Sequence, residues 1–208
     1  MSSAMIDLYA ANTSNSQRVA IMLEECEISY LVHRVDLGRG EHRSASFLAL
    51  NPAGAVPVIV DPAAPGGALT LAQSGAILLY LAMKTGRYFP KDPALRALAF
   101  QWFMLATTDC SSVSTMIFLN HAVLPDKSPS NVAFFEDRLS RYLAIVDDRL
   151  AANRYLADEL SIADFALYPV VRVRYGLVER VGNLPHLVRW ADELGARAGV
   201  ARGMAAIE

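Results

Sequence analysis

Residues 56–61 read VPVIVD and residues 69–82 read LTLAQSGAILLYLA, and these two segments decide the fold of the first half of the chain. The first is rich in β-branched residues, which predicts a strand over residues 56–60. A Pro-Gly-Gly turn precedes the second, which predicts a short strand over residues 68–71 and an apolar helix over residues 73–84. Strands joined by a tight turn pair antiparallel, so we expect a hairpin followed by a helix.

Upstream of this hairpin, strands and helices alternate along the chain. The sequence predicts a strand over residues 5–10, a helix over 16–27, a strand over 30–35 and a short helix over 44–50. A strand, a helix and a second strand in this order favour a parallel pair joined by a right-handed crossover. The complete order resembles that of the thioredoxin-like fold.

The second half of the chain has a different pattern. After a turn-rich stretch, GRYFPKDP, no segment has the alternation of a strand, and residues 109–130 are expected to be helical with a break near Pro125 and Pro129. We therefore expect a thioredoxin-like α/β domain at residues 1–87, a linker at 88–93 and an all-α domain at 94–208. The helices expected in the second domain span residues 94–108, 131–151, 161–175 and 185–198.

Composition and charge exclude several classes of function. The net charge is −2, so no strong field attracts nucleic acid or an anionic membrane. The first residues lack the basic start of a signal peptide, and no apolar run is long enough to span a bilayer. Cys26 and Cys110 are too far apart for a CxxC motif, which favours a reducing, cytoplasmic location. The hydrophobic fraction of 53% also predicts apolar surface that a partner subunit covers.

A polar run, Asn12 to Ser16, follows the first predicted strand and leads into the first helix. A helix start offers unpaired N–H groups and a partial positive charge, which stabilise an anion such as a thiolate. Thr13 or Asn15 would donate a further hydrogen bond to it. Lowering a thiol pKa from about 8.5 to about 6.5 requires roughly 2.7 kcal/mol, and one charge-assisted hydrogen bond contributes about 1.5–3 kcal/mol. The alternative is an ordinary N-cap, because Ser, Thr and Asn are favoured there.

Two further segments have the features of a ligand site. Pro57 lacks the N–H of a strand ladder, and a cis bond before it would turn the Val56 backbone outward to pair with an extended peptide. A trans bond is the commoner case, and the residues alone leave this open. Gln73 and Ser74 stand at a helix N-terminus, where free N–H groups and a hydroxyl suit a carboxylate, although a helix cap explains them equally well.

A ligand with a carboxylate, an extended peptide backbone and a thiol fits these three segments, and glutathione is such a ligand. VPVIVD followed by LTLAQSGAILLYLA resembles the glutathione-site signature of the cytosolic glutathione S-transferases. In that family the proline is cis, the residue before it pairs with the cysteinyl amide, and an acidic-or-Gln and Ser pair holds the γ-glutamyl end. The resemblance assigns these roles to Pro57, Val56, Gln73 and Ser74. LSIADF, at residues 160–165, resembles the structural helix-capping motif of the same family.

The chain is most similar to the nu-class and Ure2-like members of this family, in the segments MIDLYAANTSNSQRVAIMLEE, VDLGRGEH and SGAILLYLA. In those proteins Thr and Asn at the positions of Thr13 and Asn15 face the thiol, and disulfide-bond reductase activity is typical. No cysteine lies in residues 9–17, unlike in members with a catalytic cysteine. Tyr9 is the rival thiol contact, because some members use a tyrosine at the end of the first strand.

Two more residues match positions at which the family binds glutathione. His42 stands near the position that meets the glycine carboxylate, where a histidine can donate, and a solvated loop histidine is the alternative. In related proteins an arginine of the second domain also reaches glutathione. Arg138 is the matching residue here, although it lies one helical turn later than the family position.

We therefore expect a glutathione transferase with disulfide-bond reductase activity, in which the thiol of bound glutathione attacks a disulfide or a small electrophile. Glutathione is the expected co-substrate, and the family usually forms homodimers. No metal is expected, because the histidines do not cluster with carboxylates at ligand spacing. The alternatives are a non-catalytic glutathione-binding regulatory or assembly module, and a peroxidase that uses its own cysteine. The Gln-Ser pair and the polar run favour the enzyme.

Overall fold

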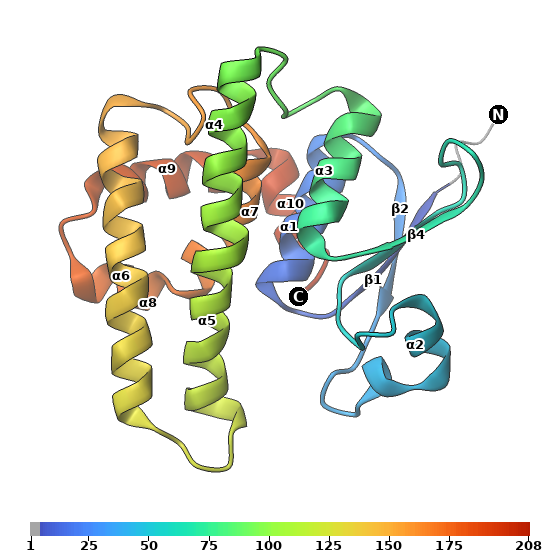
Figure 1. Ribbon diagram of the computed structural model, residues 1–208, viewed down its shortest axis with the longest axis horizontal. Coiled ribbons are helices and arrows are strands. Elements are labelled where there is room, and N and C mark those ends of the chain that lie inside the picture. The colour runs from blue at the N-terminus through green and yellow to red at the C-terminus, as the bar shows by residue number, and fades with distance from the viewer. Residues whose placement is uncertain (1–4) are drawn as a thin grey trace. The chain divides into compact units, whose positions relative to one another are not determined.

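A computed structural model describes residues 5–208 of the chain (Figure 1). The chain folds into two compact units, one formed by the segment up to Arg87 together with Ala196–Glu208, and the other by Tyr88–Gly195. The sequence predicts one all-α domain over residues 94–208, whereas the structure groups the segment from Ala196 onward with the first unit. Within residues 5–208, no helix has both the length and the apolar character that a membrane span requires.

The first unit is built on four strands: β1 (Ile6–Ala10), β2 (Tyr30–Arg34), β3 (Val58–Asp61) and β4 (Leu69–Ala72). They form one mixed sheet in the order β2-β1-β3-β4. β1 pairs in parallel with β2, whereas the β1–β3 and β3–β4 pairs are antiparallel. A parallel pair extended by a hairpin is the arrangement expected from the order of elements, so the prediction of a thioredoxin-like α/β fold is confirmed.

Three helices of the first unit pack on this sheet: α1 (Ser14–Glu25), α2 (Ala45–Leu50) and α3 (Ser74–Thr85) (Figure 1). α1 and α3 cover one face, where the alternate β1 side chains of Ile6 and Leu8 are buried. α2 lies against the other face, and its Phe47 forms a cluster with Val58 against which Tyr9 packs. Because side chains alternate along a strand, Ile6 and Leu8 face α1 and α3, whereas Tyr9 faces α2.

The C-terminal helix α10 (Ala198–Ala205) packs closely on α1. A Cβ atom placed on Gly203 would lie 2.5 Å from the Cα atom of Ile21, so the two backbones approach each other directly. An ion pair flanks this contact, in which Arg197 donates to both carboxylate oxygens of Glu25 at 3.0 and 2.6 Å. These contacts join the end of the chain to the first unit. Helical periodicity does not reveal them, because they link residues far apart in the sequence.

The second unit contains the helical elements α4 (Pro93–Met104), η2 (Leu105–Cys110), α5 (Ser111–Phe118), η3 (Leu119–Val123), α6 (Pro129–Ala152), α7 (Ile162–Val173), α8 (Tyr175–Val181) and α9 (Pro185–Gly195). This confirms the helical second domain. The stretch from α4 to Val123 is helical throughout. The π-helical segment η2 joins α4 to α5, and the π-helical segment η3 continues α5 to Val123. The helix predicted over residues 161–175 is two helices, which meet at Arg174.

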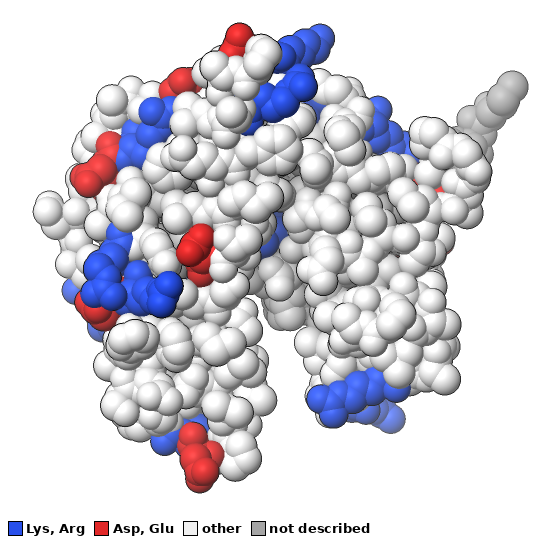
Figure 2. Space-filling model, viewed as in Figure 1, with Lys and Arg blue, Asp and Glu red and all other residues white. Residues whose placement is uncertain are grey.

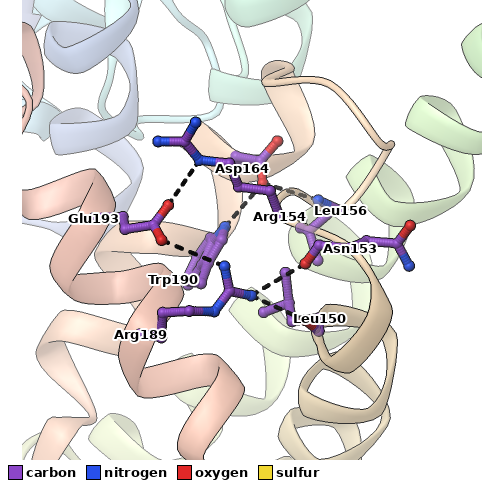
Figure 3. Close-up of polar contacts among 8 residues, drawn as sticks. All are labelled: Leu150, Asn153, Arg154, Leu156, Asp164, Arg189, Trp190 and Glu193. Carbon is purple, nitrogen blue, oxygen red and sulfur yellow. Dashed lines mark hydrogen bonds and ion pairs between the residues drawn. The ribbon is translucent and has the colours of Figure 1, made fainter.

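Asp164 is the polar centre of the core of the second unit (Figure 3). Its carboxylate accepts hydrogen bonds from the backbone N–H groups of Leu156 (3.1 Å) and Ser161 (3.0 Å) and from the indole N–H of Trp190 (2.9 Å). Ser161 caps α7 and completes the capping box expected from the sequence. Burial raises the pKa of Asp164, although the hydrogen bonds from its donors oppose that rise. One buried carboxylate therefore ties α7, α9 and the segment before α7 together.

Candidate functional site

The polar run after β1 forms the start of α1. Thr13 is the N-cap: its hydroxyl oxygen accepts from the Ser16 N–H at 3.2 Å, and its O–H donates to Ser16 Oγ at 3.1 Å. Nearby, the side-chain amide of Gln17 donates to Asn12 Oδ1 at 3.2 Å. The N-cap interpretation that the sequence left open therefore applies to Thr13, whose hydroxyl is occupied within the loop.

Asn15, the second residue of α1, has donors that are not used in this way. Its side chain is half-buried, and neither its amide nor the backbone N–H groups of Ser14 and Asn15 make a hydrogen bond with another residue of the described chain. Such groups are the orphan donors of a helix start, and they lie at the positive end of the helix dipole. Asn15 and these two N–H groups can therefore hold a thiolate.

Tyr9 packs on the α2 side of the sheet. Its ring stacks on His33 with centroids 4.6 Å apart and planes 16° from parallel, and His33 Nε2 lies 2.7 Å from Asp7 Oδ1. Both rings line a cavity of about 560 Å³ that Phe47 and Leu50 of α2 also bound. Tyr9 therefore lies on the α2 face of the sheet and remains the rival thiol contact that the sequence offered.

The loop before β3 presents a backbone edge. The Val56–Pro57 bond is cis, as the resemblance implied, and Val56 makes no backbone hydrogen bond with the other residues that the structure describes. Asn51, which the sequence analysis did not single out, holds this loop. Its buried side chain donates to the Ala55 carbonyl oxygen at 2.6 Å and accepts from the Ala53 N–H at 3.2 Å. An asparagine directly before a proline was the available signal, because such residues often bond to their own loop.

The strand register places Gln73 beside this loop. Val58 pairs with Ala72, so Pro57 and Gln73 continue the two strands at the same end of the hairpin. Gln73 is exposed and has a φ of 69°, in the left-handed region. A non-glycine residue held there costs about 1–3 kcal/mol, and such residues cluster at ligand sites. The backbone at Gln73 is therefore held in a shape that suits a binding role.

Ser74 begins α3 and lies next to an arginine that the sequence analysis missed. Its hydroxyl oxygen accepts from Arg18 Nη1 at 3.5 Å, and the two residues are only 9% and 1% exposed. A guanidinium behind a serine at a helix N-terminus adds positive charge to a position already suited to a carboxylate. The available signal was a single arginine beside the apolar run of residues 19–23.

His42 lies in η1 (Glu41–Arg43), a short turn before α2. Its Nδ1 atom is enclosed and has no hydrogen-bond partner among residues 5–208. Its carbonyl oxygen would lie 3.1 Å from a Cβ atom placed on Gly54, so η1 contacts the loop before β3. Arg39 and Arg43 are exposed on either side of His42, and Figure 2 shows Lys and Arg side chains grouped at the α2 end of the first unit. Glu41 stands between Arg39 and Arg43 in the sequence, and its carboxylate accepts from the Asp36 N–H at 2.8 Å, so the charge around His42 is mixed.

Arg138 lies on α6, whereas the other predicted site residues lie on the first unit. Its guanidinium is exposed, and Nε and Nη2 donate to the hydroxyl oxygen of Tyr142 at 3.3 and 3.2 Å. Tyr142 in turn donates to Asp109 Oδ1 at 3.2 Å. The structure thus brings the predicted residues of the first unit to neighbouring loop ends and holds Arg138 in a separate chain of hydrogen bonds.

Neither cysteine has the surroundings of a reactive thiol. Cys26 and Cys110 are both buried. Burial raises the pKa of the Cys26 thiol, and a hydrogen bond with Thr85 only partly opposes this. In the part of the chain that the structure describes, no group of His, Cys, Asp and Glu side chains could hold a metal ion. A reactive thiol at the start of α1 would therefore come from a bound ligand.

Comparison with known proteins places the chain in a family. The models described as the glutathione S-transferase N-terminal and C-terminal domains match residues 13–84 and 114–198. The chain is 32% identical to the disulfide-bond oxidoreductase YfcG of Escherichia coli (strain K12), over 96% of this chain and 94% of that protein. It is 31% identical to the disulfide-bond oxidoreductase YghU of the same organism, over 95% of this chain and 73% of that protein.

Solved structures of glutathione transferases also match along almost the whole chain. One from Pseudomonas putida, with one glutathione disulfide bound per subunit, has a TM-score of 0.90 and 31% identity, over 96% of this chain and 90% of that one. Another from Burkholderia graminis, with two glutathione molecules bound per subunit, has a TM-score of 0.89 and 32% identity, over 96% and 87%. Together with the family models that match both halves, these similarities show that the chain belongs to the glutathione S-transferase family.

Proposed function

We propose that this protein is a glutathione transferase with glutathione-dependent disulfide-bond reductase activity. The observation that carries the proposal is the set of unused donors at the start of α1, on Asn15 and the first N–H groups. The position of Ser74, with Arg18 behind it, supplies an anion subsite on the neighbouring helix α3. Relatives named as disulfide-bond oxidoreductases and the Pseudomonas putida structure with bound glutathione disulfide support the proposal.

The reduction takes two thiol–disulfide exchanges. The thiolate of bound glutathione attacks one sulfur of a disulfide RS–SR, which forms GS–SR and releases a thiolate RS⁻ that takes up a proton. A second glutathione thiolate attacks the glutathione sulfur of GS–SR, which yields glutathione disulfide and a second RSH. Two electrons pass from two glutathiones to the disulfide, and the attacking group must be a thiolate in each exchange. With a chlorodinitrobenzene as the small electrophile, the same thiolate instead forms a C–S bond as the C–Cl bond breaks, which yields a thioether and releases chloride.

Each part of glutathione has a proposed partner on the chain. Ser74 and Gln73 hold the γ-glutamyl end, and the Val56 backbone, which precedes the cis Pro57, pairs with the cysteinyl amide. His42 and its basic neighbours receive the glycine carboxylate. The family resemblance assigns a further contact to Arg138, whose guanidinium is exposed.

The thiol itself is proposed to meet the start of α1. Asn15 donates to the sulfur with its free amide, and the first N–H groups of the helix add the dipole. Thr13 keeps these groups in place through its bonds to Ser16, and stabilises the thiolate through the helix start that it caps. Because Cys26 and Cys110 are both buried, neither supplies a rival thiol at this position.

Asn15→Ala is expected to lower kcat/KM for glutathione-dependent reduction of 2-hydroxyethyl disulfide at least about tenfold, because a charge-assisted hydrogen bond contributes about 1.5–3 kcal/mol. With glutathione saturating, the pH profile of kcat/KM for the disulfide reports the pKa of the bound thiol. This apparent pKa should rise in the variant, because the thiolate loses a donor. Tyr9→Phe is the matched control, and it should leave both quantities near the wild-type values. An equal or larger loss in Tyr9→Phe would show that the tyrosine hydroxyl, and not Asn15, serves the thiol.

The wild-type protein needs two parallel assays. Reduction of 2-hydroxyethyl disulfide, coupled to the recycling of glutathione disulfide, is expected to be strong, and conjugation of a chlorodinitrobenzene substrate is expected to be weak. If glutathione binds but neither reaction occurs, the proposal fails, and the protein is a non-catalytic glutathione-binding module.

We further propose a cytoplasmic homodimer of the nu class. The resemblance of the first unit to nu-class sequences supports the class, and two buried free cysteines suit a reducing compartment. Light scattering is expected to give twice the mass of one chain, and a monomer at micromolar concentration would contradict the dimer. Large apolar side chains that are more than half exposed supply surface for a second copy to cover: Met5, Met83, Phe118, Val123, Phe134, Ile145 and Val173.

A further inference from the structure

We propose that the second unit carries an anion-binding site centred on Arg174 and Ser114, whose ligand is a small carboxylate or a similar oxyanion. Arg174 lies half-buried where α7 ends and α8 begins. Its Nε donates to Ser114 Oγ at 2.9 Å, and its Nη2 donates to the Ser114 carbonyl oxygen at 2.6 Å. Both bonds go to one buried residue of α5, so they fix the plane of the guanidinium.

No carboxylate of the described chain pairs with this guanidinium. By contrast, Nη2 of Arg149, on α6 of the same unit, lies 2.6 Å from Oδ1 of Asp158. The acid whose charge acts on Arg174 is Glu136, and that carboxylate is bound to Arg180 at 2.7 Å. Burying a cation without a counter-charge is unfavourable, and burial lowers the pKa of Arg174 accordingly. An anion on Arg174 would remove this cost.

The donors that Arg174 retains have the geometry of an anion clamp. A guanidinium has five N–H donors, and the bonds to Ser114 use the edge formed by Nε and Nη2. The opposite edge, formed by Nη1 and Nη2, is the edge that binds a carboxylate through two parallel hydrogen bonds. α5 also lies between the π-helical segments η2 and η3, and π-helical turns are frequent at functional sites.

Succinate, measured on the protein without glutathione, is the first probe. At constant ionic strength, isothermal titration is expected to show saturable binding to the wild type that weakens at least tenfold in Arg174→Met. Arg174→Lys keeps the positive charge but lacks the pair of parallel donors, so its affinity for succinate should fall between those of the wild type and Arg174→Met. Arg141→Met is the matched control, because Arg141 is exposed and already paired with Asp137, and the affinity of this variant for succinate should match that of the wild type.

An absence of saturable binding, or equal affinities in the wild type and Arg174→Met, would overturn the site. Circular dichroism and the thermal midpoint show whether each variant is folded. If Arg174→Met is unfolded, Arg174→Lys decides the question on the same terms. Because succinate contains no disulfide and glutathione is absent, this test does not depend on catalysis, and a failure of the proposed function would be seen separately.

Two sources of such an anion can be separated by kinetics, and the first rests on the proposed function. If the carboxylate belongs to the disulfide substrate, Arg174→Met should raise KM for 3,3′-dithiodipropionate about tenfold and leave KM for neutral 2-hydroxyethyl disulfide unchanged. If both KM values stay unchanged while succinate binding is lost, the site takes a separate anion. Both results support the site, whereas unchanged KM values with unchanged succinate binding would contradict it.

Discussion

Replacing Asp164 with alanine is expected to lower the free energy of unfolding by about 3–5 kcal/mol, because several buried donors lose their acceptor. The donors are the N–H groups of Leu156 and Ser161, the Ser161 hydroxyl and the Trp190 indole, which lie 2.9 to 3.1 Å from a carboxylate oxygen. A buried donor without a partner costs about 1–3 kcal/mol. Asp164→Asn keeps the shape and one acceptor oxygen, so its loss should be about half as large.

Asp92→Ala is the matched control for this prediction. Asp92 also stands at a helix N-terminus, where it accepts from the N–H groups of Ala94 and Leu95, both at 2.9 Å, but it is exposed. Losing an exposed cap costs about 1 kcal/mol. Urea unfolding of the three variants, followed by circular dichroism, would measure the difference. If Asp164→Ala loses no more stability than Asp92→Ala, Asp164 is not the polar centre of this core.

Gly203→Ala is expected to destabilise the protein by about 3 kcal/mol, because overpacking a close contact costs about 1–3 kcal/mol and more where backbones meet. The new Cβ atom would lie 2.5 Å from the N and Cα atoms of Ile21 and 2.8 Å from the carbonyl carbon of Ala20. Backbone atoms cannot rotate away as a side chain does, so α10 must move off α1. The better helix propensity of alanine offsets only about 1 kcal/mol of this.

Gly176→Ala on α8 is the control for the same substitution in a helix. A Cβ atom on Gly176 would meet nothing within 4 Å, so this variant should be as stable as the wild type or slightly more stable. Thermal unfolding compares the two variants. Gly203→Ala should also bind glutathione more weakly, because α1 carries Asn15 and Arg18. Equal thermal midpoints in the two variants would contradict the close approach of α10 to α1.

The sequence alone predicted the features that depend on neighbours along the chain. The capping box joins Ser161 and Asp164, only three residues apart, so its pattern of residue types was sufficient. The two strand-like segments after Pro57 likewise predicted the hairpin, because only residues 62–68 separate the paired strands β3 and β4. β3 begins at Val58, later than the predicted strand over residues 56–60, because Pro57 has no N–H for the ladder.

The sequence predicted the candidate site only in part. It named Thr13 and Asn15 together, because the residue types that cap a helix are also those that hold a thiolate. The structure separates them: the Thr13 hydroxyl is bonded to Ser16, and the Asn15 amide is not used by another described residue. It also packs Tyr9 against His33 on the α2 side, a direction that the identity of the residue does not reveal.

The sequence by itself determined the order of the elements, the helical second domain and the polar segments that are proposed to bind glutathione. Only the tertiary structure decided which distant residues meet. Arg18 reaches Ser74 across 56 residues, Arg174 reaches Ser114 across 60, and Arg197 reaches Glu25 across 172. The physical reason is that periodicity reports which face of an element is buried, whereas the partner on that face is set by how the elements pack.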